Sequence, residues 1–403
     1  MGVLFLLTLL LGAFMPALPE PIDPRAIAFG VGSGSLMFVW LVRRLMRKTT
    51  VWCPAGSWLT GFLMLVGLSA LTAQWFGTPL ELWLRGAVPF LFLSLFFPAY
   101  ELARRDPHWV VDVLGLSAAA WLANIALTAG MAVPAVLHGE VLRITHATEA
   151  WASFQLPYAL IGLITSLFHP PRRARWLRWP LALAYSLVPL LAVSRGQIIV
   201  VGIVWTLYAI WLGRRRRWGV ALTSVTGLVL LGNLVASQSE LGHSILERFA
   251  ATGLQSEASR LEEIRYALEQ FRESPLFGKG LGYQIPAQIT FGGDWAMIAV
   301  AGVGSVGYMH NVVAYLLMDL GLAGLLAYFG FIASVLRPGG KRGIPGHHEA
   351  RRAGVLMTLA LLFWFLMQPS FRHIQSNVLL AAAIAVVAAT QGRRGSFSYA
   401  RSA

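Results

Sequence analysis

Long apolar stretches separated by short polar segments dominate the pattern of this chain. Backbone groups in hydrocarbon must be hydrogen-bonded within their own segment, so these stretches are predicted to be membrane-spanning helices. Several are a little shorter than the ~20 residues of an untilted span, and their boundaries are soft. The twelve stretches cover roughly residues 1–18, 26–42, 55–75, 84–100, 108–131, 152–168, 179–193, 197–213, 219–236, 310–336, 353–370 and 377–390.

The pattern breaks once, over residues 237–309, where no long apolar run occurs. Such a segment is far longer than an ordinary helix connection, and long loops are usually functional. The sequence therefore predicts an all-α integral membrane protein in three parts. Residues 1–236 carry helices 1–9, residues 237–309 form a large loop, and residues 310–403 carry helices 10–12 and a basic tail.

Composition agrees with this organisation. The chain has 403 residues, of which 57% are hydrophobic and 12% charged, whereas a soluble protein carries about a quarter charged residues. A single cysteine, Cys53, excludes an internal disulfide framework and a cysteine-built zinc site. The first 18 residues resemble a signal-peptide core, but they lack a basic start, and "MPALPEP" is a poor cleavage site. We interpret them as an uncleaved first span.

The net charge of +14 would suggest nucleic acid in a soluble chain, but here topology explains it. With the N-terminus in the cytoplasm, 22 of the 32 Lys and Arg residues fall in cytoplasmic segments, as the positive-inside rule requires. No nucleic-acid partner is therefore expected, and the partner is the lipid bilayer. The ten basic residues on the outer side have no such explanation; they are Arg25, Arg85, Arg143, Arg195, Arg248, Arg260, Arg265, Arg272, Lys279 and Arg372.

Within the long loop, "SRLEEIRYALEQFRES" predicts an amphipathic helix near residues 260–273. Ser259 followed by Glu262 is a capping-box pattern, which places the helix start at Arg260. Arg260 lies within the apolar face and Arg265 at its edge, so both are candidates for binding an anion at the membrane surface. The alternative is snorkelling, in which the arginine stems cover apolar surface and the charges reach water. The apolar face comprises Leu261, Ile264, Leu268 and Phe271.

Further candidates lie in short outer segments. Arg195 sits in "LLAVSRGQIIVV", a hairpin between two spans, where an interfacial anchor is the alternative. Arg85 and the pair Arg372–His373 occupy similar positions and are weaker candidates. The segment "PLFGKGLGY" after the loop helix is predicted to form tight turns rather than a phosphate cradle, because no strand precedes it.

"HNVVAYLLMDLGLAGLLAYFGF" carries three polar residues where an anchor would carry leucine: His310, Asn311 and Asp319. If the helix begins at His310, the same face carries small residues, which mark a helix-packing side. His310 is then predicted to point into the protein, as a catalytic base or as a buried structural histidine. Asp319 lies on the other side, and we interpret it as a structural hydrogen-bond or ion-pair partner.

Together, "SRLEEIRYALEQFRESPLFGKGLG", "HNVVAYLLMDLGLAGLL" and the "SRG" at 194–196 resemble the shared region of bacterial O-antigen ligases and O-antigen polymerases. The resemblance covers about residues 185–390; the first half matches only as a run of spans. Asp319 stands where the family more often has Glu, and Ile264 where it often has an aromatic residue.

The resemblance implies an all-helical membrane glycosyltransferase fold (GT-C-like) in the bacterial inner membrane, with its active site at the periplasmic face. A ligase transfers a glycan from undecaprenyl diphosphate to a sugar hydroxyl of lipid A–core, completing lipopolysaccharide. It implies that His310 is the base that activates this hydroxyl, with Asn311 assisting. It also implies that Arg195, Arg260 and Arg265 bind the diphosphate.

The residue chemistry suits that reaction. Arginine binds phosphate oxygens bidentately and keeps its charge, and histidine is the side chain suited to general-base work near neutral pH. The five aspartates form no Asp-x-Asp pair, so we expect a metal-independent reaction without a cofactor, although Glu262 and Glu263 leave a metal conceivable.

Other functions remain open. O-antigen polymerase, which uses a second carrier-linked glycan as acceptor, is the nearest alternative, followed by a protein O-oligosaccharyltransferase. A transporter or flippase would also have many spans, but its polar groups would lie near the membrane midplane, whereas here they gather at one face. The sequence specifies neither the glycan, the accepting core sugar nor the oligomeric state.

Overall fold

The fold is taken from a computed structural model that describes residues 1–14, 24–47, 53–137, 156–170, 175–191, 195–214, 253–291, 305–307, 309–337 and 346–391. The elements are α1 (Gly2–Phe14), α2 (Pro24–Arg47), α3 (Pro54–Trp75), α4 (Leu80–Leu91), η1 (Phe92–Leu95), α5 (Phe96–Arg105), α6 (Pro107–Leu137), η2 (Arg175–Leu177), α8 (Arg178–Leu191), α9 (Arg195–Arg214), α12 (Gly253–Glu273), β1 (Ile285–Pro286), α13 (Ala287–Phe291), β2 (Ser305–Val306), α15 (Val312–Leu336), α16 (His348–Met367), η4 (Pro369–Arg372) and α17 (Ile374–Thr390). A further apolar helix covers Leu156–Phe168.

The predicted membrane stretches coincide with helices wherever the structure describes them; the stretch at 219–236 lies outside the described residues. Among the residues that the structure describes, five helices are long and apolar enough to cross a bilayer, namely Ala55–Trp75, Leu80–Arg105, Pro107–Leu127, Val312–Leu336 and His348–Met367. The protein is therefore a helical membrane protein with several spans. The number of twelve stays a prediction.

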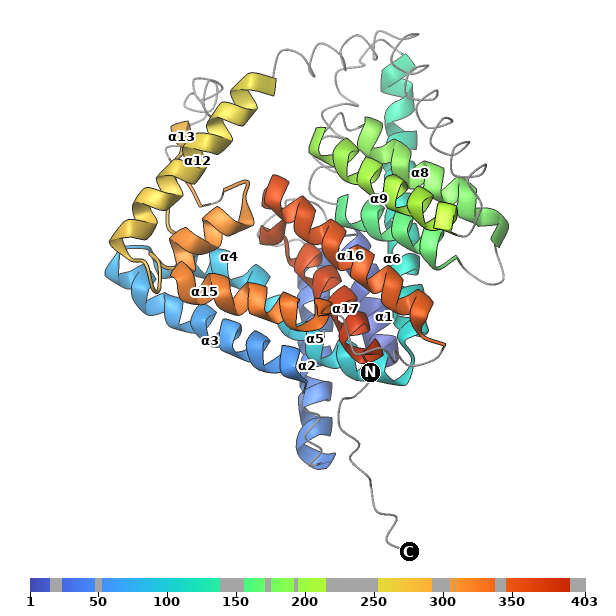
Figure 1. The fold of residues 1–403 in the computed structure, drawn as a ribbon, viewed down its shortest axis with the longest axis horizontal. Helices are drawn as coiled ribbons and strands as arrows, with labels where there is room; N and C mark the ends of the chain where they lie inside the picture. The colour runs from blue at the N-terminus through green and yellow to red at the C-terminus, as the bar shows by residue number, and fades with distance from the viewer. Residues whose placement is uncertain are drawn as a thin grey trace, which may run out of the picture.

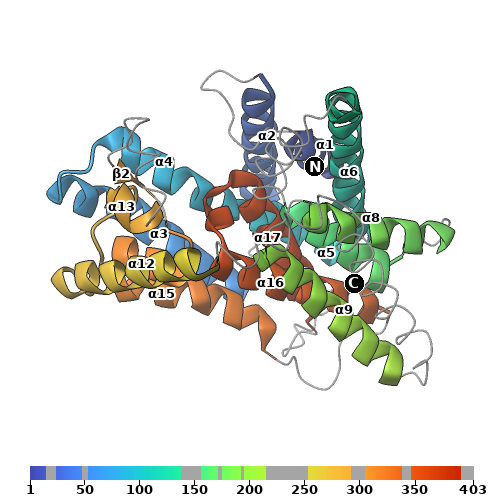
Figure 2. The same cartoon turned by 90° about the horizontal axis from the view of Figure 1, so that it is seen from above.

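Helix α17 forms the centre of the bundle. Its residues from Gln375 to Ala388 are all buried, and it packs against α5, α6 and α16. Many of them are alanines, and small side chains allow neighbouring helices to approach closely. Figure 1 shows α12 and α13 to one side of α16 and α17, and α8 and α9 to the other. Figure 2 shows α1 between α2 and α6, both of which it contacts.

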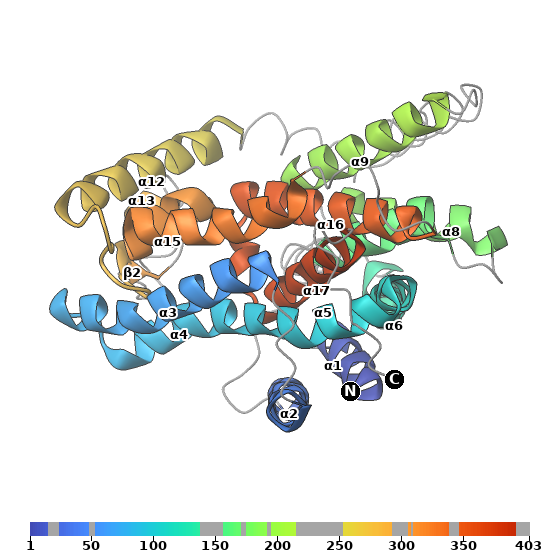
Figure 3. The same cartoon turned by 60° about the horizontal axis from the view of Figure 1, so that its bottom comes forward.

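Helices α12, α15 and α3 form successive layers on one side of the bundle (Figure 3), and α15 contacts both of the others. The helix in the long loop begins at Gly253 rather than Arg260. Ser259 thus lies inside α12, and the capping-box prediction was wrong, because the helix extends through the pattern that would have started it. The described residues are mainly helical, consistent with the predicted all-α membrane protein; the two-residue strands β1 and β2 pair antiparallel with Ile285 opposite Val306.

Helix α15 is interrupted at Gly321, whose φ of 63° is not helical. The segment 275–280 fills the interruption. Lys279 N–H donates to the Met318 carbonyl at 2.8 Å and Gly280 N–H to the Asp319 carbonyl at 2.8 Å. On the other side, the Leu322 and Ala323 N–H groups donate to the Pro275 and Leu276 carbonyls at 2.9 and 3.1 Å. These four hydrogen bonds to the segment replace the two that an unbroken helix would form, from the N–H of residue 322 to the carbonyl of residue 318 and from the N–H of residue 323 to the carbonyl of residue 319.

Two glycines make this fit possible. A Cβ on Gly278 would lie 2.4 Å from the Asp319 carbonyl carbon, and one on Gly280 would lie 2.3 Å from the Ala73 nitrogen of α3. Both residues have positive φ, which side-chain-bearing residues rarely adopt. The "PLFGKGLG" segment is therefore a packed junction between α3 and α15, in agreement with the prediction of tight turns.

Candidate functional site

His310 lies two residues before the first residue of α15, at the end of the long loop. Asn311 is the N-cap of that helix, and its Oδ1 accepts the Val313 N–H at 2.9 Å and the Ala314 N–H at 3.1 Å. The Asn311 Nδ2 also donates to the Leu366 carbonyl of α16 at 3.3 Å. The expected helix start at His310 was thus wrong, because Asn is a better cap than a first helical residue. Asn311 fixes the backbone next to His310.

A buried glutamate holds His310 from the loop helix. Glu263 of α12, whose side chain is 1% exposed, accepts the His310 backbone N–H at 3.0 Å through Oε2. Its Oε1 lies 2.9 Å from the ring Nδ1 of His310, whose side chain is 25% exposed. Both carboxylate oxygens therefore act on one residue that is 47 positions away in the chain.

This arrangement selects the histidine tautomer. A carboxylate accepts a hydrogen bond, so Nδ1 carries the proton and Nε2 carries the lone pair. When Nε2 takes up a proton, the adjacent carboxylate stabilises the resulting imidazolium, as in other histidine–carboxylate pairs at active sites. The pair can therefore act as an oriented general base. The sequence indicated His310 but not Glu263. The adjacent residues Glu262 and Glu263 point about 100° apart on a helix, so the sequence shows only that one of them could face inward.

The inward side of α12 differs from the predicted apolar face. Glu263 and Ala267 are buried, whereas Leu261 and Leu268 are 59% and 44% exposed. The helix is turned so that its carboxylate meets His310, and two of the four predicted apolar residues face outward. The helix is amphipathic in sequence, and its buried side carries the Glu263 carboxylate that contacts His310.

The two loop arginines lie on different sides of α12. Arg260 precedes Glu263 by three residues, so it belongs to the same helix side and is partly buried. Arg265 has a side chain that is 72% exposed and pairs with Glu262 at 2.8 Å. Only Arg260 is therefore brought near the His310 side of the helix, and the diphosphate-binding roles of both stay predictions.

The remaining predicted arginines are dispersed. Arg195 is the first residue of α9, and its side chain lies outside the described residues. Arg85 of α4 is exposed and pairs with Glu81 at 2.5 Å. Arg372 is partly buried in η4, with its guanidinium beside Gly307 and within the electrostatic reach of Asp319. Arg372 thus lies closer to the His310 segment than the sequence implied.

His373 follows Arg372 and caps α17 with its backbone. Burial, reinforced by the neighbouring Arg372 guanidinium, lowers the pKa of His373 to about 4. The ring is therefore neutral at pH 7. A neutral histidine beside an arginine could accept a hydrogen bond, and its assignment to the site stays a prediction.

Asp319 and Lys279 both have structural contacts. Asp319 is fully buried, and its Oδ2 accepts the Gly282 N–H at 3.3 Å, in line with the interpretation as a structural partner. Lys279 is 2% exposed, forms an ion pair with Glu273, and lies 4.0 Å from the centroid of the Phe76 ring. The N–H groups of residues 278–280, 282 and 283 all donate to protein oxygens, so they do not form an anion cradle.

Within the described residues, no group of three or more His, Cys, Asp or Glu side chains is placed to hold a metal ion. Glu262 and Glu263, the pair that kept a metal conceivable, point to different partners: Glu262 to Arg265 and Glu263 to His310. Metal independence stays a prediction.

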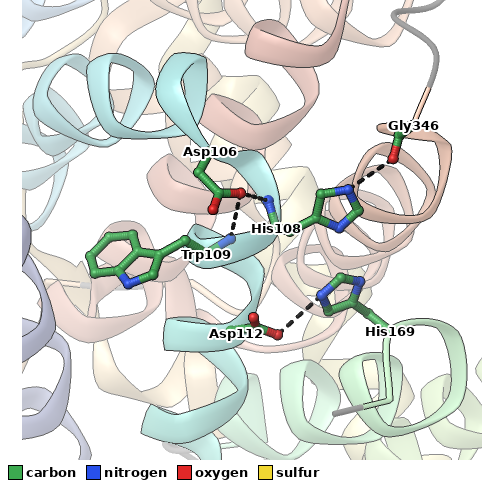
Figure 4. A network of polar contacts seen from close by, with 6 residues as sticks. All are labelled: Asp106, His108, Trp109, Asp112, His169 and Gly346. Carbon is green, nitrogen blue, oxygen red and sulfur yellow. Dashed lines mark hydrogen bonds and ion pairs between the residues drawn. The ribbon is translucent and has the colours of Figure 1, made fainter. Parts of the chain in front are cut away.

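A second histidine network lies at the other end of the bundle (Figure 4). The rings of His108 and His169 stack with centroids 5.2 Å apart, and His347 lies 5.5 Å from His108. His169 Nε2 is 3.1 Å from Oδ1 of Asp112, whose side chain is 60% exposed. His347 directly precedes α16 and Leu366 lies at its far end, so the network is ~28 Å from the His310 end at 1.5 Å per residue.

Comparison with known families and proteins bears on the His310 end. Residues 180–329 match the family model described as O-antigen ligase. The matched region includes both Glu263 and His310, and it supports a relationship to the O-antigen ligase/polymerase family. No curated protein matches the chain.

Proposed function

We propose that the protein is an O-antigen ligase. In this proposal it transfers O-antigen polysaccharide from undecaprenyl diphosphate to a sugar hydroxyl of lipid A–core, at the periplasmic face of the bacterial inner membrane. The observation that carries the proposal is the Glu263–His310 pair: a buried carboxylate orients a partly exposed histidine, within the region that matches the family. Family membership alone supports only a glycosyltransferase-like membrane enzyme with a lipid-linked donor and a lipid acceptor.

The chemistry assigned to the pair is general-base catalysis. Nε2 of His310 removes the proton of the acceptor hydroxyl as its oxygen attacks the anomeric carbon of the donor glycan. The bond from that carbon to the carrier phosphate breaks, and the diphosphate leaves with the electron pair. Glu263 keeps Nε2 in the accepting tautomer and stabilises the imidazolium. Such a base contributes about 10²–10⁴-fold to a rate.

The leaving diphosphate gathers negative charge, which fixed positive charge must offset. Arginine suits this role because it remains charged in a poorly solvated site and binds two oxygens at once. Arg260 is supported by its place on the Glu263 side of α12, and Arg372 by its place beside Gly307. Three further candidates for binding the diphosphate remain. Two, Arg195 and Arg265, rest on the family pattern, and Arg85 rests on its position in the chain.

One experiment separates the candidate functions. Purified protein is incubated with carrier-linked glycan, with and without lipid A–core. Glycan transfer that requires lipid A–core supports the ligase, whereas chain extension without it supports a polymerase. Transfer to a protein acceptor supports an O-oligosaccharyltransferase, and carrier movement across vesicles without transfer supports a flippase.

The periplasmic location is tested separately. A single cysteine at Arg272, exposed on α12, is introduced in a Cys53→Ser background and treated with a membrane-impermeant thiol reagent in cells with a permeabilised outer membrane. Labelling is expected in these cells while the inner membrane is intact. Labelling only after lysis would reverse the orientation.

A further inference from the structure

A cavity lies at the end of α3 opposite the His310 site. It has a volume of about 700 Å³, is partly open, and is lined by residues of α2, α5 and the first turns of α3. Gly56 lines it, whereas Ala73 at the other end of α3 contacts Gly280; 17 residues correspond to ~26 Å along a helix. The cavity is thus separate from the proposed catalytic site. Figure 1 shows α2, α3 and α5 meeting in the lower part of the bundle.

The wall of this cavity is strongly basic. Four arginines and one carboxylate, Glu101, line it, so the formal net charge of the lining is +3. Glu101 pairs with Arg105 at 3.2 Å and so offsets one of the four charges. The first turn of α3 also lines the cavity, its N-cap residue Cys53 forms no side-chain capping hydrogen bond, and a helix N-terminus favours an anion. The arginines are Arg43, Arg44, Arg104 and Arg105.

The deeper wall is aromatic and apolar. Trp40 stacks on Phe97 with centroids 5.3 Å apart, and the Arg44 guanidinium lies 5.3 Å from the Trp40 ring centroid. A second cavity of about 410 Å³, bounded by Leu65 and Ala327, shares Gly61 and Met64 with the first. An apolar path therefore continues from the basic region along α3. The basic region lies where the span Ala55–Trp75 begins and the span Leu80–Arg105 ends.

We propose that this cavity binds an anionic phospholipid. The phosphate would lie among the arginines and an acyl chain would follow the apolar path beside Gly61. Basic pockets between membrane helices are suited to anionic headgroups, and an aromatic residue at the interface fits the headgroup–acyl boundary. The positive-inside rule explains why arginines occur at this end of the bundle. It does not explain why four of them surround one cavity with an aromatic wall.

Native mass spectrometry of the purified, delipidated protein tests this site. The protein is mixed with equal amounts of phosphatidylglycerol and phosphatidylcholine of the same acyl chains. We expect one retained phosphatidylglycerol, favoured over phosphatidylcholine by at least about tenfold, because both lipids carry a phosphate but the cationic choline of phosphatidylcholine cancels the charge that the arginines attract. Inorganic phosphate and glycerol 3-phosphate at millimolar concentration should not displace it, because the acyl chain contributes to binding.

Two variants address the two halves of the site. Arg44→Gln/Arg104→Gln removes charge, and Gly61→Leu fills the apolar path at a position where a Cβ meets nothing within 4 Å. The matched controls are Arg272→Gln/Arg337→Gln, at exposed arginines away from the cavity, and Gly67→Leu, where a Cβ also meets nothing within 4 Å. Both test variants should lose the retained lipid while the controls keep it, with similar melting temperatures throughout.

Three results would overturn the proposal: equal retention of phosphatidylcholine, retention by both test variants, or displacement by a free phosphate, which would indicate a site for a soluble anion. If the double arginine variant fails to fold, Gly61→Leu against Gly67→Leu still decides. None of these measurements uses glycan transfer. Their outcome therefore tests the lipid site independently of the proposed ligase activity.

Discussion

The two ends of the bundle each pair a histidine with a carboxylate, and the pairs differ in which partner is buried. At the His310 end, the carboxylate of Glu263 is 1% exposed and the histidine 25%. At the opposite end, Asp112 is 60% exposed and His169 only 10%. A buried carboxylate with two bonds to one residue fixes that residue's position and tautomer. An exposed one is solvated and contributes little.

The difference indicates where a polar network is organised for chemistry. Glu263 is withdrawn from water and would be costly to bury without His310. Asp112, in contrast, has water available, so its contact with His169 joins a solvated carboxylate to a mostly buried ring. Similar distances of 2.9 and 3.1 Å therefore describe two different kinds of contact.

Replacing the histidine of each pair should give the largest difference in transfer rate between the two ends. His310→Ala is expected to lower the transfer rate by about 10²–10⁴-fold with a nearly unchanged melting temperature, because the base is lost and the fold is kept. His169→Ala, the matched variant at the other end, should keep the wild-type rate. Transfer of carrier-linked glycan by purified protein and thermal unfolding in detergent are measured together. A folded His310→Ala protein with near-normal turnover would exclude His310 from the mechanism.

Changing the carboxylates should give the next largest effect. Glu263→Gln keeps the shape but presents an amide N–H₂ to the ring, which favours the tautomer with the proton on Nε2. We expect kcat to fall about 10- to 100-fold, consistent with loss of a hydrogen bond to a charged group, with KM for both substrates little changed. Asp112→Asn should leave both constants unchanged. A rise in KM with normal kcat would instead assign Glu263 to substrate binding.

The arginines on α12 provide a third test. Arg260→Lys should reduce transfer by about tenfold, since lysine offers a point charge in place of a two-pronged donor. Arg265→Lys is expected to have a smaller effect, because Arg265 faces away from Glu263 and is largely exposed. Steady-state kinetics of the two variants make the comparison. Equal losses would mean that the diphosphate reaches the outward side of α12.

Lowering the pH should reduce the stability of the fold through His373, at the His310 end. Its folded-state pKa of about 4 lies below the value of about 6.5 for an unfolded chain, so the unfolded state binds the proton first. This contribution to stability is intact above pH 6.5 and is lost as the pH falls from 6.5 to 4. The melting temperature should therefore drop by a few degrees over that window, and less in His373→Gln. The matched variant His348→Gln, at an exposed position of the other end, should follow the wild type; the same slope in all three proteins would contradict the assignment.

Chelation should have the smallest effect. Activity is expected to survive exhaustive EDTA treatment, because positive charge at the leaving group comes from arginine in the proposed mechanism. The check is the transfer rate before and after chelation. Loss of activity that magnesium or manganese restores would mean that carboxylates such as Glu262 hold a metal ion.

The helices were predictable and the pair at the site was only half predictable. Apolar runs of spanning length have few alternatives in a bilayer, which is why the stretch at 353–370 coincides with α16. His310 was predictable because a polar residue at the mouth of an apolar run is unusual. Glu263 was not, since its partner is 47 residues away and the apolar periodicity of α12 pointed to a different inward face.

The starts of α12 and α15 show a second limit. A Ser-x-x-Glu pattern can cap a helix, but it can equally lie inside one, and in α12 the chain is already helical from Gly253. For α15, the sequence was interpreted with the helix beginning at His310, whereas Asn311 is the N-cap and also contacts the Leu366 carbonyl. Local sequence fixes these boundaries only to within a few residues, and a site residue next to a boundary is placed by its neighbours.

The interruption of α15 at Gly321 has a consequence for how the chain enters the membrane. Gly321 is the tenth residue of the helix, ~14 Å from its start at 1.5 Å per residue, so α15 in this interrupted conformation would expose unbonded backbone groups to lipid without its partner segment. Residues 275–280, which satisfy those groups, precede α15 in the chain and are synthesised first. During biogenesis the helix should therefore settle only once that segment has docked beside α3. Lengthening the connection between them should slow maturation in the membrane more than it weakens the finished protein.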